Sequence, residues 1–112
     1  MNDCVFCSIT QGQAMARIVY QDEDVTVFHD LHPQAPVHLL LIPNHHVAGV
    51  SQVEEADEAV LGKLFSVARR VAEELGVADY RLVVNNGRQA GQSVFHLHVH
   101  LLGGRSMGWP PG

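Results

Sequence analysis

Hydrophobic and polar residues alternate with a period of two along residues 93–102, which read Ser-Val-Phe-His-Leu-His-Val-His-Leu-Leu. Successive side chains of a β-strand point to opposite faces, so this pattern predicts a strand with two different faces. One face would be apolar and pack on a core: Phe95, Leu97, Val99 and Leu101. The other would carry three histidines, about 6.6 Å from one to the next by the rise of a strand: His96, His98 and His100. Such a row predicts a chemical function.

A helical period predicts one long helix over residues 54–75. Apolar residues recur there at intervals of three or four: Ala56, Val60, Leu64, Val67, Val71 and Leu75. Ser51-x-x-Glu54 has the form of a capping box, and Gly76 is a natural C-terminal stop. Further apolar residues make the stripe broader than one sheet needs: Leu61, Phe65, Ala68 and Ala72. Either a second subunit covers part of this face, or the helix is wedged deep in its own domain.

Short apolar runs predict further strands at residues 17–20, 25–29, 37–42 and 81–85. Residues 86–93 form a polar loop with two glycines, so the strands on either side of it are expected to be an antiparallel pair. The tail, residues 103–112, is too rich in Gly and Pro for regular structure. Trp109 in this tail is expected to pack against another part of the protein surface, such as that of a neighbouring subunit.

Composition narrows the class of protein. The chain of 112 residues suits one domain, and its 46% hydrophobic and 17% charged residues are ordinary for a globular protein. No apolar run is long enough to span a membrane, and the N-terminus lacks the pattern of a secretion signal, which predicts a cytoplasmic protein. The net charge of -5, without clusters of Lys or Arg, argues against nucleic-acid binding.

The histidine segment allows two chemistries. A pair of histidines two apart on a strand could hold a metal, although the outer two of the three would lie about 13 Å apart. Alternatively, the middle imidazole could attack phosphorus as a nucleophile if its other nitrogen is held in one tautomer. The preceding loop favours the second, because Gly87 and Gly91 allow close approach of an anion and Ser93 stands near a leaving group.

The segment from Gly91 to Leu102 resembles the signature of the histidine triad (HIT) family, His-x-His-x-His-x-x with apolar x. Phe28-His29-Asp30 and Pro43-x-x-His46 also resemble that family, and the tail is similar to its Hint branch, the nucleoside phosphoramidases. The resemblance implies an α+β, HIT-like fold over a single domain, residues 1–112. That fold would have an antiparallel sheet of about five strands, one long helix, an irregular tail at residues 103–112 and a two-fold symmetric dimer.

The resemblance also implies catalytic roles. His98 would be the nucleophile that takes the nucleoside monophosphate, and His100 would orient it and help proton transfer. Ser93 would contact the leaving amine, and His96 is the remaining member of the triad.

A purine nucleotide pocket is implied in the same way. Asn85 and the backbone of Gly91, Gln92 and Val94 would hold the phosphate, and Asp30 would accept hydrogen bonds from the ribose. Four apolar residues would sandwich the base: Phe6, Ile9, Phe28 and Leu31. The alternatives are that these four are ordinary core and that Asp30 only terminates its strand.

Cys4-x-x-Cys7 has the spacing of half a zinc site. A reducing cytosol would keep both thiols free. The resemblance supplies His46 and His96 as the remaining ligands of a structural zinc, which catalysis would not require. His45 is a rival for His46, and the alternative without metal is two reduced cysteines beside the sheet.

Three functions follow from these observations. The first is cleavage of the P–N bond of a purine nucleoside phosphoramidate by a homodimer, through a nucleotidyl-His98 intermediate. The second is hydrolysis of a dinucleoside polyphosphate; the Trp109-Pro-Pro tail favours the first over it. The third is a nucleotide-binding scaffold, against which the set of His98, Ser93 and Asn85 argues.

Overall fold

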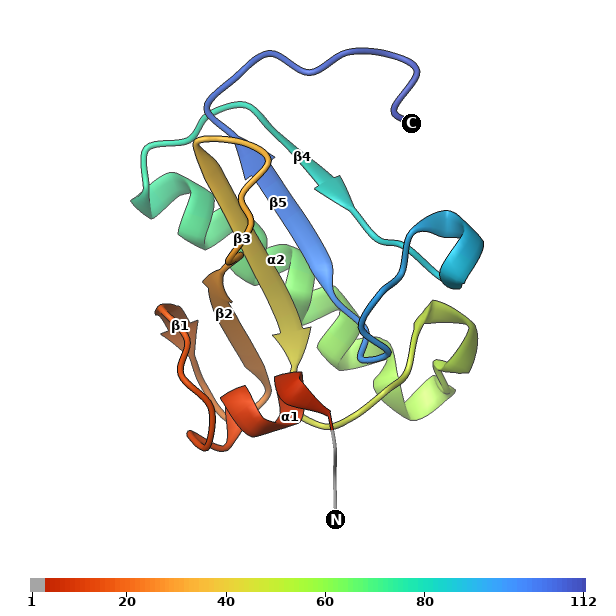
Figure 1. Ribbon diagram of the computed structural model, residues 1–112. Helices are drawn as coiled ribbons and strands as arrows, with labels where there is room; N and C mark the ends of the chain where they lie inside the picture. The colour runs from red at the N-terminus through yellow and green to blue at the C-terminus, as the bar shows by residue number, and fades with distance from the viewer. Residues whose placement is uncertain (1–3) are drawn as a thin grey trace.

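The computed structural model describes residues 4–112 and shows one antiparallel sheet with a long helix on one face (Figure 1). The strands follow the order β1-β2-β3-β5-β4. Their bounds are β1 Ile18–Gln21, β2 Val25–His29, β3 Val37–Pro43, β4 Tyr80–Val83 and β5 Val99–Gly103. The five-stranded antiparallel sheet and the single long helix confirm the predicted α+β class. The prediction about a secretion signal rests on Met1, Asn2 and Asp3, which lie outside the described residues.

The long helix, α2, spans Glu58–Glu74 and continues a short 3₁₀ turn, Glu55–Asp57. The predicted capping box at Ser51 is wrong by three residues. The Glu54 N–H donates to Oδ2 of Asp57 at 2.9 Å, whereas the Ser51 N–H donates to Oδ1 of Asn86 at 3.0 Å. Gly76 follows the helix with a φ of 72°, a conformation that favours glycine and ends the helix as expected.

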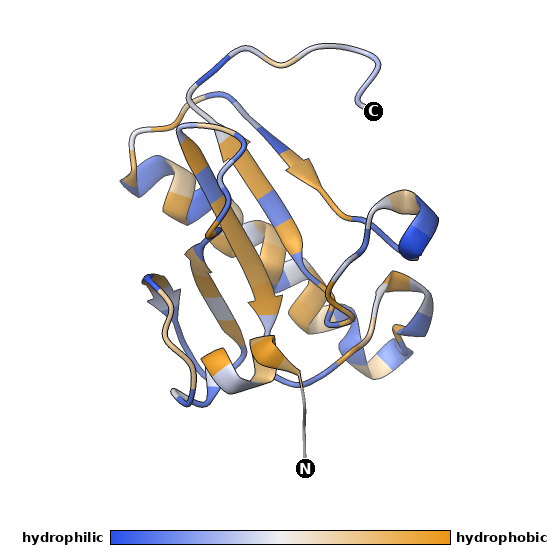
Figure 2. Ribbon diagram, in the orientation of Figure 1, coloured by the Kyte–Doolittle hydropathy of each residue, from blue (hydrophilic) through white to orange (hydrophobic). Residues whose placement is uncertain are grey.

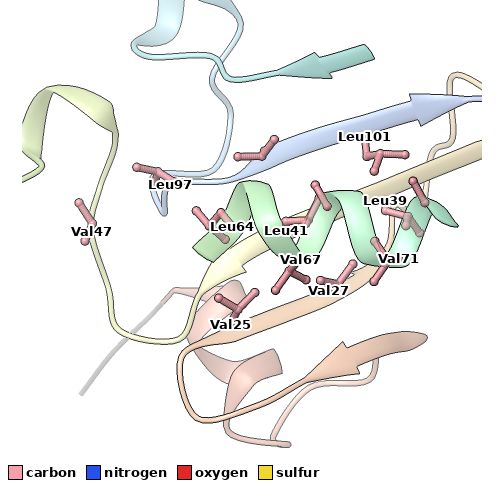
Figure 3. Close-up of a cluster of buried hydrophobic side chains, with 13 residues drawn as sticks. Val25, Val27, Leu39, Leu41, Val47, Leu64, Val67, Val71, Leu97 and Leu101 are labelled. Carbon is pink, nitrogen blue, oxygen red and sulfur yellow. The ribbon is translucent and has the colours of Figure 1, made fainter. Parts of the chain in front are cut away.

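The main core lies between α2 and the sheet (Figure 3). Alternate residues of the central strands point toward the helix and are fully buried: Val25, Val27, Leu39, Leu41 and Leu101. Leu64, Val67 and Val71 meet them from α2. Figure 2 shows β3 as a nearly continuous hydrophobic strand, as expected for a strand with both faces covered. Phe65, on the predicted broad stripe, is 56% exposed in the single chain.

The opposite face of the sheet has a smaller core under the first helix, α1, which spans Val5–Thr10. Phe6 and Ile9 pack there with side chains of β2 and β3: Phe28, Leu40 and Ile42. The same face carries His38 and His100, because they alternate with residues that point toward α2. This is the face of the sheet that bears the histidines.

The predicted strand at residues 93–102 is only half correct, because β5 begins at Val99. Residues 94–96 form a bend, and the Leu97 N–H donates to the carbonyl oxygen of Val47 at 2.6 Å instead of joining the sheet. Phe95 is therefore 38% exposed, contrary to the prediction that it faces the core, and its ring packs against Arg88. Because of the bend, His96 does not continue the line of His98 and His100 along one face of a strand.

The remaining segments differ little from expectation. The strand predicted at residues 81–85 is β4, Tyr80–Val83, so Asn85 lies in the loop that follows it. Residues 104–112 form no helix or strand, and Trp109 is 83% exposed in the single chain. Within residues 4–112, none of the helices combines the length and the apolar character that a membrane crossing requires.

Candidate active site and metal centre

His98 is held in one orientation by the main chain. Its Nδ1–H donates to the carbonyl oxygen of His96 at 2.7 Å, and only 6% of the residue is exposed. The edge of the Phe6 ring packs against it, with centroids 5.2 Å apart. Because a neutral imidazole carries one N–H, a donor at Nδ1 leaves a lone pair on Nε2. His98 therefore has the tautomer that a nucleophilic nitrogen requires.

His100 is the end of a hydrogen-bonded chain that crosses from β3 to β5. The Gln34 N–H donates to Nδ1 of His38 at 3.0 Å, so the proton of neutral His38 is on Nε2. That Nε2–H donates to Nδ1 of His100 at 2.9 Å. The proton of neutral His100 is consequently on Nε2, where it can be donated to a bound oxyanion.

Burial keeps both residues of this chain neutral. It lowers the pKa of His100 to about 4, helped by the neighbouring His98 and His38, while Asp30 opposes the shift. Burial also lowers the pKa of His38, again against the effect of Asp30. At neutral pH the site therefore presents two uncharged imidazoles with defined donors and acceptors.

Asp30 stands beside this chain. Its Oδ2 lies 3.4 Å from Nε2 of His38, and its Oδ1 accepts a hydrogen bond of 2.7 Å from the His32 N–H. Asp30, His38 and His100 are also close enough together to hold a metal ion. Hydrogen bonds among these residues and with the main chain account for their arrangement without a metal.

The loop before the histidines is braced by Gln92. Its Oε1 accepts the Gly87 N–H at 2.8 Å, and its Nε2 donates to the carbonyl oxygens of Ala48 at 2.8 Å and Val94 at 3.1 Å. Both polar atoms of this side chain therefore make hydrogen bonds within the protein. Gly91, with a φ of 98°, requires glycine, and a Cβ there would meet the Asn85 side chain at 3.7 Å. The side chain of Asn85 therefore lies beside Gly91.

The residues predicted to sandwich a purine are placed unequally. Phe6, Ile9 and Phe28 are buried in one cluster, in which the Phe6 and Phe28 rings meet edge to face at 5.4 Å. Val94 packs against this cluster, whereas Leu31 is 81% exposed and lies outside it. Ser93 is exposed at the edge of the same loop.

The structure brings together Cys4, Cys7, His46 and His96, with ligand atoms all within 4.8 Å of one another. Nδ1 of His96 lies 3.3 Å from Sγ of Cys4 and 3.5 Å from Sγ of Cys7. Nδ1 of His46 lies 3.5 Å from Sγ of Cys7. These separations are close to the roughly 3.5 Å between sulfur and nitrogen ligands of one tetrahedral zinc.

The tautomer of His96 also fits a metal. Its Nε2–H donates to the carbonyl oxygen of Pro43 at 2.8 Å, so the lone pair on Nδ1 faces the two sulfurs. Burial lowers the pKa of His96 to about 4, which keeps the ring neutral. His45, the rival ligand, pairs with Asp57 at 2.9 Å instead. Four protein ligands would leave no open position, as in structural zinc sites.

His96 thus contributes to both sites through different atoms. Its ring belongs to the Cys/His cluster, and its carbonyl oxygen holds the ring of His98. From the sequence, His38 is a loop or strand residue without an assigned role. The signal was present, since His38 is the polar residue in the apolar run of β3 and has the same parity as Leu40 and Ile42.

This geometry defines a histidine-triad protein, and the comparisons agree. A model of the HIT domain matches residues 11–107, and the chain belongs to the HIT family. It is 49% identical over 111 residues to an uncharacterised HIT-like protein of Synechocystis, covering 98% of this chain and 97% of that protein. A 14 kDa zinc-binding protein of Zea mays is 46% identical, over 96% of this chain and 87% of the relative.

A solved structure is similar over the whole chain. The crystal structure of a HIT family hydrolase from Legionella pneumophila superposes with a TM-score of 0.95 at 44% identity, covering 98% of this chain and all of the other. Helix α1, which contains Cys7 and is preceded by Cys4 at its N-cap, lies before the residues that the family model matches.

Proposed function

We propose that this protein hydrolyses purine nucleoside 5'-phosphoramidates of the AMP-amide type through a covalent nucleotidyl-histidine. The observation that carries the proposal is the Nδ1–H bond from His98 to the His96 carbonyl oxygen, which leaves Nε2 free to attack. The hydrolase names of similar structures support the reaction class.

In the first step, Nε2 of His98 attacks the phosphorus and the P–N bond breaks. The leaving nitrogen takes a proton from solvent, relayed by the Ser93 hydroxyl, while His100 keeps its proton on Nε2. In the second step, water attacks the phosphorus, the bond to His98 breaks to restore the neutral imidazole, and the proton lost by the water returns to solvent. The Nε2–H of His100 would stabilise the phosphoryl oxygens while charge develops.

The substrate would be positioned by three groups of residues. Asn85 and the backbone of the 91–94 segment would donate to the phosphate, with Gln92 holding that segment in place. Asp30 would accept from the ribose hydroxyls. The buried cluster of Phe6, Ile9 and Phe28 would support one side of the purine, with exposed Leu31 at its rim.

We propose zinc as the metal of the Cys4/Cys7/His46/His96 cluster, with a structural role. Bound there, it would cross-link α1 to the segments that carry His46 and His96 and take no part in bond breaking. The exposed His46 would give the ion a route of entry. The name of the maize relative supports this assignment.

We also propose a two-fold dimer. β4 is an outer strand of the sheet, so one of its edges can pair with a second copy. Exposed apolar side chains accompany this strand and α2: Phe65, Leu75, Tyr80 and Val84. Sedimentation equilibrium at micromolar concentration should give twice the mass of 12.3 kDa, and a monomer would contradict the proposal.

The reaction is tested by mass spectrometry of protein mixed with an adenosine phosphoramidate and quenched quickly in alkali. A transient adduct of one AMP, absent in His98→Ala, is the expected result. Turnover of a diadenosine polyphosphate at a higher kcat/KM would select the dinucleotide as substrate. Binding of AMP without any turnover would select the nucleotide-binding scaffold.

A further inference from the structure

Helix α1 belongs to two sites at once. Cys4 and Cys7 contribute sulfur atoms to the Cys/His cluster, and Phe6 and Ile9 lie in the apolar cluster proposed to support the base. The ring of Phe6 contacts both His96, at 5.9 Å between centroids, and His98, at 5.2 Å. A change in the position of this helix therefore affects both sites.

The helix is too short to be stable on its own. It has six residues, and isolated helices below about 12 residues are marginal in water. Besides the two clusters, a hydrogen bond of 3.1 Å from Nε2 of Gln21 to the Thr10 carbonyl oxygen connects α1 to the sheet. Its position consequently depends on packing at Phe6 and Ile9 and on ligation at Cys4 and Cys7.

The second connection between the sites passes through His96. Its ring is held between the sulfurs and the Pro43 carbonyl oxygen, and its own carbonyl oxygen accepts the Nδ1–H of His98. Fixing the ring of His96 therefore also fixes the acceptor that orients His98.

We propose that metal binding at the Cys/His cluster and nucleotide binding at the histidine face are positively coupled through α1 and His96. This inference rests on the proposed nucleotide site. Metal ligation would order α1 in advance, so that the nucleotide no longer bears that entropic cost. Coupling is reciprocal, so AMP must raise the affinity for the metal by the factor by which the metal raises the affinity for AMP. Known couplings predict a factor of roughly 5 to 150.

The test uses Zn²⁺ and AMP. AMP is titrated calorimetrically into zinc-loaded protein freed of excess metal and into protein stripped with a chelator. Zinc affinity is then measured against a chromophoric chelator, with and without saturating AMP. We expect the two ratios to agree and to exceed 5. Equal AMP affinity in both forms, or no zinc binding, would overturn the coupling while leaving the nucleotide site intact. AMP binding by neither form would overturn the proposed function, and the coupling with it.

A pair of adjacent histidines supplies matched variants. His46→Ala removes one ligand and should weaken AMP binding in the presence of zinc, whereas His45→Ala, whose ring pairs with Asp57, should bind AMP as the wild type does. Hydrogen exchange distinguishes coupling from general destabilisation. In stripped wild-type protein, the amides of α1 should exchange faster while those of α2 are unchanged. Faster exchange in both helices would contradict the proposed route.

Discussion

Nε2 of His38 donates to Nδ1 of His100 across the β3–β5 ladder, at 2.9 Å. The two residues are not opposite each other, because His100 pairs with Leu40 and His38 with Leu102. They are diagonal neighbours on one face, which is within the reach of two imidazole rings. The Gln34 N–H donates to Nδ1 of His38 and so determines that His38, and not His100, is the donor in this pair.

His38→Ala should lower kcat about 10- to 100-fold, the range found when a partner that orients a metal-bound histidine is lost. The reason is that His100 would lose the donor that places its own proton on Nε2. KM should change little, because His38 is not proposed to touch substrate. His32→Ala is the control, since the exposed His32 contributes its main-chain N–H to Asp30 and alanine retains it. An unchanged kcat would remove His38 from the proposed mechanism.

His98→Ala should abolish turnover and the AMP adduct while the circular dichroism spectrum stays native. Ser93→Ala is the graded comparison, because Ser93 is proposed to assist only the leaving group. It should slow adduct formation yet still show the adduct in the quenched sample. Turnover by His98→Ala at the wild-type rate would refute the covalent mechanism.

Gln92→Ala should lower the free energy of unfolding by about 1–3 kcal/mol. The reason is that the Gly87 N–H and the carbonyl oxygens of Ala48 and Val94 would each lose the hydrogen bond that Gln92 makes with them. The loosened loop should also raise KM. Gln92→Glu retains the acceptor for Gly87 but turns a buried carboxylate toward the carbonyl oxygens of Ala48 and Val94, so its effect should be at least as large. Urea denaturation gives the first quantity and steady-state kinetics the second. If neither substitution changed the free energy of unfolding, the hydrogen bonds of Gln92 would not stabilise the protein.

Acid should destabilise the protein between pH 6.5 and pH 4. The pKa of His100 falls from 6.5 to about 4 on folding, so in this window the unfolded chain binds a proton that the native state does not. Stability due to His100 is fully present above pH 6.5 and is lost as the pH falls. Urea midpoints of metal-free protein at several pH values should show this slope, and His100→Asn should make it less steep, with His96, whose pKa burial also lowers to about 4, contributing to the remainder. An identical slope in the variant would assign the effect elsewhere.

The regular elements were predictable because their signals are local. The apolar run of β2 and the helical stripe of α2 each depend on residues within the element, and both lie close to their predicted bounds. The bend at residues 94–96 was not predictable, because its cause is a hydrogen bond from Leu97 to Val47, about fifty residues earlier. The same holds for the helix cap, since the Ser51 N–H is taken by Asn86.

Part of the candidate site was also predictable. The spacing of Cys4 and Cys7 predicted half of a metal site, the family resemblance supplied His46 and His96, and the structure brings the four together. Neither predicted that Gln92 bonds to the Ala48 carbonyl oxygen or that His38 bonds to His100, because these contacts join residues remote in sequence.

The alternation of β3 and β5 divides this sheet into two sets of positions with separate tasks. Residues at alternate positions, such as Leu39, Leu41 and Leu101, pack against α2, and those between them, such as His38 and His100, lie on the face of the proposed site. Each set can therefore vary in evolution without the other, as long as the strands keep their alignment. Insertion or deletion of one residue within either strand would exchange the two sets, placing imidazoles in the core and leucines in the site. This sheet can therefore accept substitutions in either set, but it cannot accept a change in strand length by a single residue.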